Sequence, residues 1–215
     1  MITAEQVRDL REKTGAGMLD CKKALEENKG DFEKAVDWLR SKGLGAAAKK
    51  SARLASEGLI YAYIHGEGRI GVMVEVNSET DFVARNEKFQ AFVKDIAMQI
   101  AAMSPLCVSS DEIPSDVLER ERQVLIAKAK EQGKKAEMLD KIVEGQLKKF
   151  ATEKCLLSQP YVKNPDVTVQ QLLTEAIATI GENIKVRRFV RYELGEGLEK
   201  KQANFAEEVM SQVRS

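Results

Sequence analysis

Apolar residues in the first 43 positions recur at helical spacing in three short runs. Thr3 and Gln6 form a capping-box pattern ahead of the first run, which the segment Thr14–Gly17 interrupts. Gly30 follows the second run, and Asp31 caps a third run whose apolar residues lie at i, i+3, i+4 and i+7. The pattern therefore predicts three short helices in this region.

The next segment, residues 44–56, is rich in small and basic residues. The string Gly43-x-Gly45-x-x-Ala48 at its start matches a dinucleotide-binding fingerprint. That fingerprint needs a preceding strand, so that the turn delivers phosphate to a helix N-terminus. A predicted helix precedes it here, so we interpret the match as chance and the segment as a linker.

Beyond the linker the hydrophobic period changes to two, which is typical of strands. The run Leu59–Ile64, the turn residues His65–Gly68 and the alternating run Arg69–Asn77 predict a β-hairpin. A third strand is expected at Ile184–Leu194, where the even positions are apolar apart from Arg188. Together these runs predict a small antiparallel sheet.

Helical periodicity fills most of the chain between the hairpin and the third strand. An apolar stripe from Phe89 to Ile100 predicts a helix that stops near Pro105. The other expected elements are a pair of helices at about 115–132 and 135–154, an irregular loop at 158–165, a helix capped by Thr168 and Gln171, and a final helix at about 202–213. Strands separated by unequal runs of helices predict an α+β fold.

The division of the chain into domains follows these changes of period, and its 215 residues are ample for a buried core. We expect a core in which a small antiparallel sheet is flanked by helices and a helical hairpin. The four parts are a three-helix head at 1–43, a linker at 44–56, the α+β core at 57–198 with its helical pair at about 115–154, and a C-terminal helical module at 199–215.

The balance of charges and the positions of the cysteines argue against several classes of protein. The 34 Lys and Arg residues balance the 34 Asp and Glu residues, whereas dedicated nucleic-acid binders usually carry a basic excess. The distant Cys21, Cys107 and Cys155 and the single histidine form no metal-ligand pattern, so no metal site is expected and a reducing compartment is favoured. Without a signal-peptide pattern or a membrane-spanning run, we expect a cytosolic protein that binds no membrane.

Candidate catalytic groups are sparse. His65 is the only imidazole, and it lies in a predicted turn with no obvious carboxylate or nucleophile beside it. The sequence contains no phosphate-binding loop, zinc-protease or serine-hydrolase motif. It therefore favours a binding protein that uses no cofactor over an enzyme.

The third predicted strand leaves an RNA-binding alternative open. Such a strand presents exposed aromatic residues flanked by cations. The residues in question are Lys185, Arg187, Arg188 and Arg191 with Phe189 and Tyr192. Strict alternation places the two aromatic residues on opposite faces, so a sheet strand with one solvated or partner-facing side is the favoured interpretation.

The segment Glu79–Asn86 leaves a predicted strand and enters a helix that already has its own apolar stripe. Phe82 lies seven residues before Phe89, so periodicity would place it in the core. A phenylalanine that follows Thr80 and Asp81 at a strand-to-helix turn is equally well placed to project from the surface as a wedge. The residues alone leave both interpretations open.

Two motifs resemble the signatures of the bacterial elongation factor Ts family: Leu10–Leu25 (LREKTGAGMLDCKKAL) and Glu79–Asn86 (ETDFVARN). The resemblance covers nearly the whole chain. It implies a ubiquitin-associated-like (UBA-like) head, an α+β core and a C-terminal helix. It also implies that the chain binds the translational GTPase elongation factor Tu, both GDP-bound and nucleotide-free, and exchanges its nucleotide.

The resemblance implies contact residues in two places. The family's wedge corresponds to Thr80, Asp81, Phe82 and Val83. Its Asp and Phe should insert beside the nucleotide site of the GTPase and disturb the Mg²⁺ and phosphate environment. The head contacts, which should grip a helix of the nucleotide domain, correspond to Arg11, Met18 and Leu19. Leu19 replaces what is commonly a second methionine and keeps the apolar area.

The chain is shorter than the longer family members, whose core has two similar subdomains. The wedge and the His65–Gly66 turn follow one another here, and His65 resembles a contact to the distal domain of the GTPase. We expect a homodimer in which a second copy supplies the missing half-core, with the helical pair at 115–154 as a candidate interface. The alternatives are a UBA-like helical adaptor and a ribosome- or RNA-binding protein.

Overall fold

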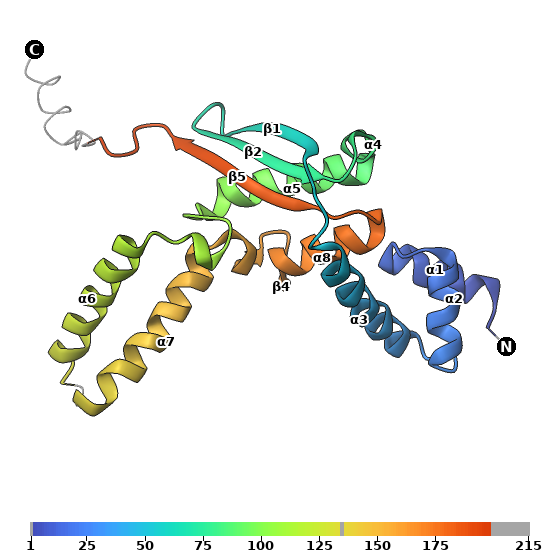
Figure 1. Ribbon diagram of the computed structural model, residues 1–215, viewed down its shortest axis with the longest axis horizontal. Helices are drawn as coiled ribbons and strands as arrows, with labels where there is room; N and C mark the ends of the chain where they lie inside the picture. The colour runs from blue at the N-terminus through green and yellow to red at the C-terminus, as the bar shows by residue number, and fades with distance from the viewer. Residues whose placement is uncertain (1, 134–135, 199–215) are drawn as a thin grey trace, which may run out of the picture.

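The computed structural model describes residues 2–133 and 136–198. These residues form a three-helix head, a sheet covered by helices and a projecting helical hairpin (Figure 1). The arrangement confirms the α+β prediction. The helix expected at about 202–213 lies outside the described residues.

The head consists of α1 (Ala4–Thr14), α2 (Met18–Glu27) and the first half of α3 (Phe32–Lys50). At the start of α1, the side chain of Thr3 accepts a hydrogen bond from the backbone of Gln6, and the side chain of Gln6 accepts one from the backbone of Thr3. The predicted capping box is therefore present. The three apolar faces enclose a small core whose fully buried members are Leu10, Cys21, Ala24, Leu25 and Ala35.

The third helix continues to Lys50, through the first half of the segment predicted to be a linker. Residues 44–50 of the expected linker are helical, because three successive alanines favour helix more than Gly45 opposes it. Small residues also let α3 pack closely on α8. Ala47 is buried, and a Cβ atom at Gly43 would lie 3.2 Å from the Cβ of Ala178.

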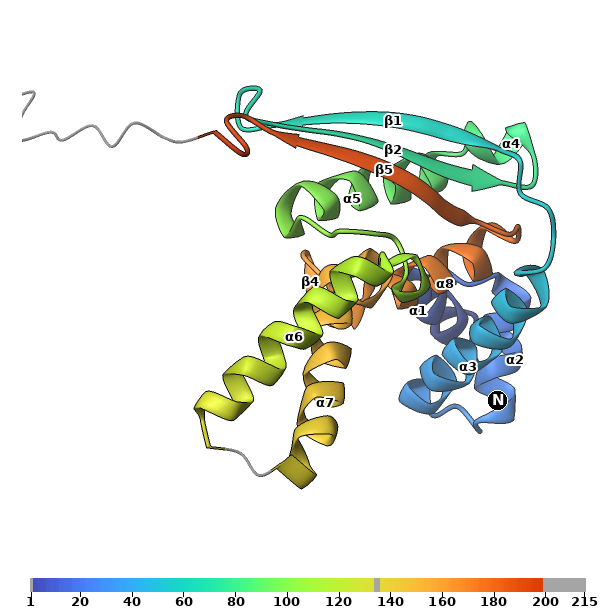
Figure 2. The same cartoon turned by 60° about the vertical axis from the view of Figure 1, so that its left-hand side comes forward.

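A three-stranded antiparallel sheet forms the centre of the core, in the order β1–β2–β5. Its strands are β1 (Glu57–His65), β2 (Ile70–Ser78) and β5 (Lys185–Glu193). The alternation predicted for β2 is confirmed, since Val72, Val74 and Val76 are all buried. The helix α5 (Glu87–Met103) covers this inner face, and its apolar stripe packs into the same core (Figure 2).

The last strand departs from simple alternation. The pairing of β2 with β5 shifts register between Glu75 and Val76, opposite Arg187, which is the extra residue of a β-bulge. The bulge reverses the alternation, so Val186 is buried but Tyr192 is exposed. The apolar even positions of the predicted strand therefore do not share one face of the sheet.

The predicted helical pair is present as α6 (Ser115–Glu131) and α7 (Ala136–Lys154), which project together from the core (Figures 1 and 2). Ala129 and Val143 are buried within this pair. At its base, beside the 3-10 helix η1 (Ser110–Glu112), Cys107 and Cys155 are both buried, with their Sγ atoms 3.4 Å apart.

The segment 158–165, predicted to be an irregular loop, contains regular structure. The 3-10 helix η2 (Leu156–Ser158) leads into a short antiparallel ribbon of β3 (Pro160–Tyr161) and β4 (Asn164–Thr168). Strands this short show no readable alternation in the sequence. The helix α8 (Val169–Ile180) follows with the predicted capping box and packs between α3 and the core.

Candidate functional site

The wedge segment, Thr80–Val83, lies where β2 turns into the one-turn helix α4 (Asp81–Ala84). The side chain of Phe82 is 77% exposed, whereas Val83 is only 9% exposed and packs into the core. The structure therefore decides between the two interpretations that the sequence left open. Phe82 projects from the surface, and its neighbour Val83 provides the buried anchor.

A carboxylate from a distant part of the chain holds the base of the wedge segment. Thr80 donates from its backbone N–H to Oε2 of Glu182 at 3.0 Å, and from its hydroxyl to Oε1 at 2.7 Å. Glu182 lies between α8 and β5. Thr80 is the N-cap residue of α4, but its side chain makes no capping hydrogen bond; the hydroxyl donates to Glu182.

The next residue, Asn183, is buried and joins Glu79, just before the wedge segment, to Arg53, just beyond α3. Its backbone N–H donates to Oε1 of Glu79 at 2.6 Å, and its side-chain amide donates to the backbone carbonyl of Arg53 at 2.8 Å. Sequence reasoning missed Glu182 and Asn183. They lie about a hundred residues from the wedge segment, and no local motif marks a contact over that distance.

Asp81, the acidic residue of the wedge segment, is exposed. Its Oδ2 lies 3.0 Å from a guanidinium nitrogen of Arg85, one helical turn further on. Exposed ion pairs of this kind contribute little to stability and exchange readily with solvent. Asp81 therefore remains available to a binding partner.

The predicted head contacts lie around the turn that joins α1 to α2. Arg11 is exposed in the last turn of α1, and the turn itself begins at Gly15 with φ of 65°. Met18 and Leu19 open α2 and are 56% and 84% exposed. Two adjacent apolar side chains at this exposure form a small projecting patch on the head.

His65 lies at the far end of the sheet from the wedge segment. It pairs with Ile70 at the hairpin, while Glu57 at the other end of β1 pairs with Ser78 next to the wedge segment. Eight residue steps along a strand correspond to roughly 26 Å. The imidazole is exposed, and its Nδ1 lies 3.0 Å from the hydroxyl of Tyr63. The structure therefore does not bring His65 together with the other predicted contacts.

The side of the sheet opposite α5 carries apolar residues that nothing in the described chain covers. Met73 lies at its centre, paired with Ala62 on one side and with Val190 on the other. We define the outer sheet face by its exposed apolar members, Ile60, Ala62, Ile64, Met73, Val190 and Tyr192. These six side chains form one continuous patch across all three strands.

Charged residues border the outer sheet face near the bulge. Glu75 lies 2.7 Å from guanidinium nitrogens of both Arg187 and Arg188. These two cations, with Arg187 contributing most, lower the pKa of the Glu75 carboxyl to about 2. Arg187 and Arg188, two of the cations in the RNA-binding alternative, are thus engaged with a carboxylate of the same sheet.

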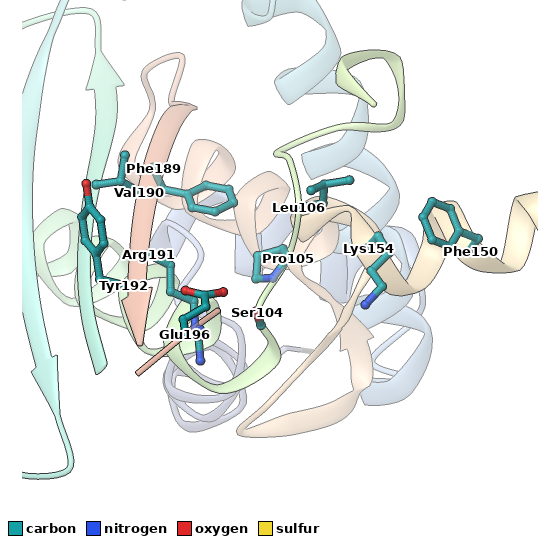
Figure 3. Close-up of a pocket in the computed structure, with 10 residues that line it drawn as sticks. All are labelled: Ser104, Pro105, Leu106, Phe150, Lys154, Phe189, Val190, Arg191, Tyr192 and Glu196. Atoms are coloured by element: carbon teal, nitrogen blue, oxygen red, sulfur yellow. The ribbon is translucent and has the colours of Figure 1, made fainter. Parts of the chain in front are cut away.

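A groove of about 570 Å³ separates β5 from the turn at Ser104–Leu106 and the end of α7. Figure 3 shows Phe189 pointing across this space, while Tyr192 lies on the other side of the strand. Arg191 closes one end, since its guanidinium donates to the carbonyl of Ala101 and pairs with Glu193.

A second cleft, of about 480 Å³, lies between α8 and the middle of α3. Glu175 lines it, and burial raises the pKa of this carboxyl against the lowering effect of Arg40. Within residues 2–133 and 136–198, no three His, Cys, Asp or Glu side chains are grouped to hold a metal ion. None of the described helices has the length and apolar character needed to cross a membrane.

These features define a class of protein. Exposed phenylalanine, leucine and methionine side chains stand on short elements that are anchored by buried neighbours. Anchored apolar side chains of this kind, with polar surroundings, are typical of surfaces that bind other proteins.

Comparison with known proteins identifies the family. The family model for "Elongation factor TS" matches residues 46–196. Elongation factor Ts of Acetivibrio thermocellus is 61% identical over 213 residues, which cover 99% of both chains. Elongation factor Ts of Geobacter metallireducens is 62% identical over 208 residues, covering 97% of this chain and 96% of the relative. The chain belongs to the bacterial elongation factor Ts family and acts in the elongation phase of protein synthesis.

Proposed function

We propose that this protein is a guanine-nucleotide exchange factor that binds elongation factor Tu and promotes the release of GDP. The observation that carries the proposal is the exposed Phe82 above the buried Val83. Phe82 enters an apolar crevice beside the nucleotide site, and Asp81 disturbs the Mg²⁺ and phosphate environment. The protein acts by binding, in the cytosol, and is not itself an enzyme; it requires no cofactor of its own.

The energetics require more than the wedge segment. A nucleotide bound at nanomolar affinity is held by about 12 kcal/mol. A shift of occupancy from 99:1 to 1:99 needs about 5.5 kcal/mol of preference for the nucleotide-free state, and the coupling is reciprocal. Burial of a phenylalanine contributes roughly 1.5–3 kcal/mol. Contacts from the head must therefore supply much of the remainder.

The arrangement of the elements supports simultaneous contributions from the wedge segment and the head. The head and α4 lie at the same end of the molecule in both views (Figures 1 and 2). Met18 and Leu19 can therefore engage the nucleotide domain of the GTPase at the same time as Phe82. His65, at the opposite end of the sheet, is positioned to reach a different domain of the same partner.

The direct test is the release of a fluorescent GDP analogue from elongation factor Tu, with and without this protein. Acceleration that saturates with protein concentration supports the proposal. Binding without acceleration would instead identify a UBA-like adaptor. Retention on RNA that falls steeply with salt, again without acceleration, would identify a ribosome- or RNA-binding protein.

We also propose that the protein is a homodimer, and the outer sheet face supports this more strongly than the helical pair. The helical pair buries Ala129 and Val143 internally, whereas the sheet leaves six apolar side chains uncovered among the described residues. Met73 stands at the centre of that patch. Light scattering at micromolar concentration should give a dimer mass for the wild type and a monomer mass for Met73→Glu. A stable wild-type monomer would overturn the proposal.

A further inference from the structure

The wedge segment is too short to hold its own orientation. α4 contains only four residues, and isolated helical turns are unstable in water. The N-cap side chain of Thr80 makes no bond to the helix that it precedes. The position of Phe82 must therefore depend on contacts made from outside the segment.

Those contacts converge on one loop. Both oxygens of Glu182 accept from Thr80, at 3.0 Å from the backbone N–H and at 2.7 Å from the hydroxyl. Hydrogen bonds to a carboxylate are stronger than neutral ones, and two bonds to one residue also fix its direction. Phe82 is two residues beyond this fixed point, and Val83 fixes the segment from the buried side.

The same loop also holds the helix that carries the head. Asn183 donates from its side-chain amide to the backbone carbonyl of Arg53, just beyond α3, and from its backbone N–H to Glu79. Two adjacent residues thus connect the wedge segment and the residue before it to the chain just beyond α3.

We propose that Glu182 is a positioning residue for nucleotide exchange: it holds Thr80 so that Phe82 projects in the orientation that displaces GDP. This inference rests on the proposed function. Glu182 acts through Thr80 and touches neither the GTPase nor the nucleotide. Loss of its carboxylate therefore impairs the action of the wedge segment more than the docking of the head.

The test measures GDP release from elongation factor Tu as a function of factor concentration, for Glu182→Ala and Glu182→Gln. A glutamine can accept from the backbone N–H of Thr80 and donate to its hydroxyl, so it keeps two neutral hydrogen bonds and loses only the charge, whereas an alanine loses both bonds. We expect Glu182→Ala to lower the maximal release rate at least about tenfold and Glu182→Gln to lower it less. Both half-saturating concentrations should stay within about twofold of the wild type, because a misplaced wedge segment acts on the rate. Glu144→Gln, an exposed residue of α7, is the matched control and should behave as the wild type.

A double-mutant cycle shows whether Glu182 acts through the hydroxyl of Thr80. Thr80→Ser keeps both donors and should retain most of the rate, whereas Thr80→Val should lower it roughly fivefold. In a Glu182→Ala background, which has no acceptor for the hydroxyl, the difference between serine and valine should shrink to less than about twofold. A full difference between them in that background would mean that the hydroxyl contacts the GTPase directly, and would overturn the proposal.

Phe82→Ala separates failure of this inference from failure of the proposed function. If the wild type does not accelerate release, the proposed function itself fails. If Phe82→Ala slows release but Glu182→Ala and Thr80→Val do not, only the positioning role is overturned. Should Glu182→Ala unfold, as judged by thermal melting, the comparison of Thr80→Ser with Thr80→Val is made in a Glu182→Met background, because methionine keeps the length of the side chain without the carboxylate acceptors.

Discussion

Replacement of Leu19 by serine should weaken docking of the head without changing the maximal rate of GDP release. Leu19 is 84% exposed, so nearly all of its apolar surface is available for burial on a partner. Complete burial of a leucine contributes roughly 1.5–3 kcal/mol, and about 2 kcal/mol is a reasonable value at this exposure. Since about 1.4 kcal/mol corresponds to a factor of ten, the affinity should fall about thirtyfold.

The assay is a titration of elongation factor Tu, loaded with a fluorescent GDP analogue, against increasing concentrations of the factor. The half-saturating concentration should rise about thirtyfold for Leu19→Ser, with the plateau rate retained. Leu54→Ser is the matched control, because Leu54 is 83% exposed and lies outside the predicted contacts. The reasoning is refuted if both variants weaken binding equally, or if Leu19→Ser leaves the titration unchanged.

Three further predictions concern stability and thiol chemistry. Gly43→Val should lower the free energy of unfolding by roughly 1–3 kcal/mol through overpacking against Ala178, whereas Gly45→Ala, with nothing within 4 Å, should raise it by about 1 kcal/mol; urea titration would measure both. The pKa of Glu75 is lowered from 4.5 to about 2, so the stabilisation that its ion pairs give the folded protein is present above pH 4.5 and is lost as pH falls towards 2. The urea midpoints of the wild type and of Glu75→Gln should therefore converge on acidification. A constant difference between them would contradict the ion-pair assignment. Burial raises the pKa of Cys107 to about 12, so iodoacetamide at pH 8 should label this thiol slowly in the folded protein and rapidly after unfolding, and fast labelling of the folded protein would exclude the buried environment.

Periodicity predicted the elements that have a single buried face. The stripe of α5 and the alternation of β2 both face one continuous core, so the apolar residues alone mark the buried side. The capping boxes at Thr3 and Thr168 were also readable, because all of their partners lie within three residues. Elements whose interacting residues lie close together in the sequence can therefore be predicted from the sequence alone.

The remaining features depend on contacts between distant segments. The bulge at Arg187 moves Tyr192 to the outer face, but its cause is the register with β2, more than a hundred residues earlier. The close packing of α3 on α8 at Gly43 likewise joins two segments that are far apart in the sequence. The exposure of Phe82 was undecidable from spacing, because Phe82 fits the stripe of α5, and only the folded chain shows Val83 buried in its place.

The proposed mechanism predicts different kinetic effects for variants of the head and variants of the wedge segment. Variants of Met18 and Leu19 should change the concentration at which exchange saturates. Variants of Phe82, and of the Glu182 that orients its segment, should change the rate at saturation. A factor that acted only by tethering would show no such separation, because every contact would affect binding alone.

The most direct measurement of the central claim is the rate of GDP release at a saturating concentration of factor, compared between the wild type and Phe82→Ala. Phe82 is exposed, so its truncation should leave the melting temperature unchanged. Loss of roughly 1.5–3 kcal/mol of wedge burial should slow the stimulated release by about tenfold or more. A Phe82→Ala variant that folds, saturates and releases GDP as fast as the wild type would contradict the account.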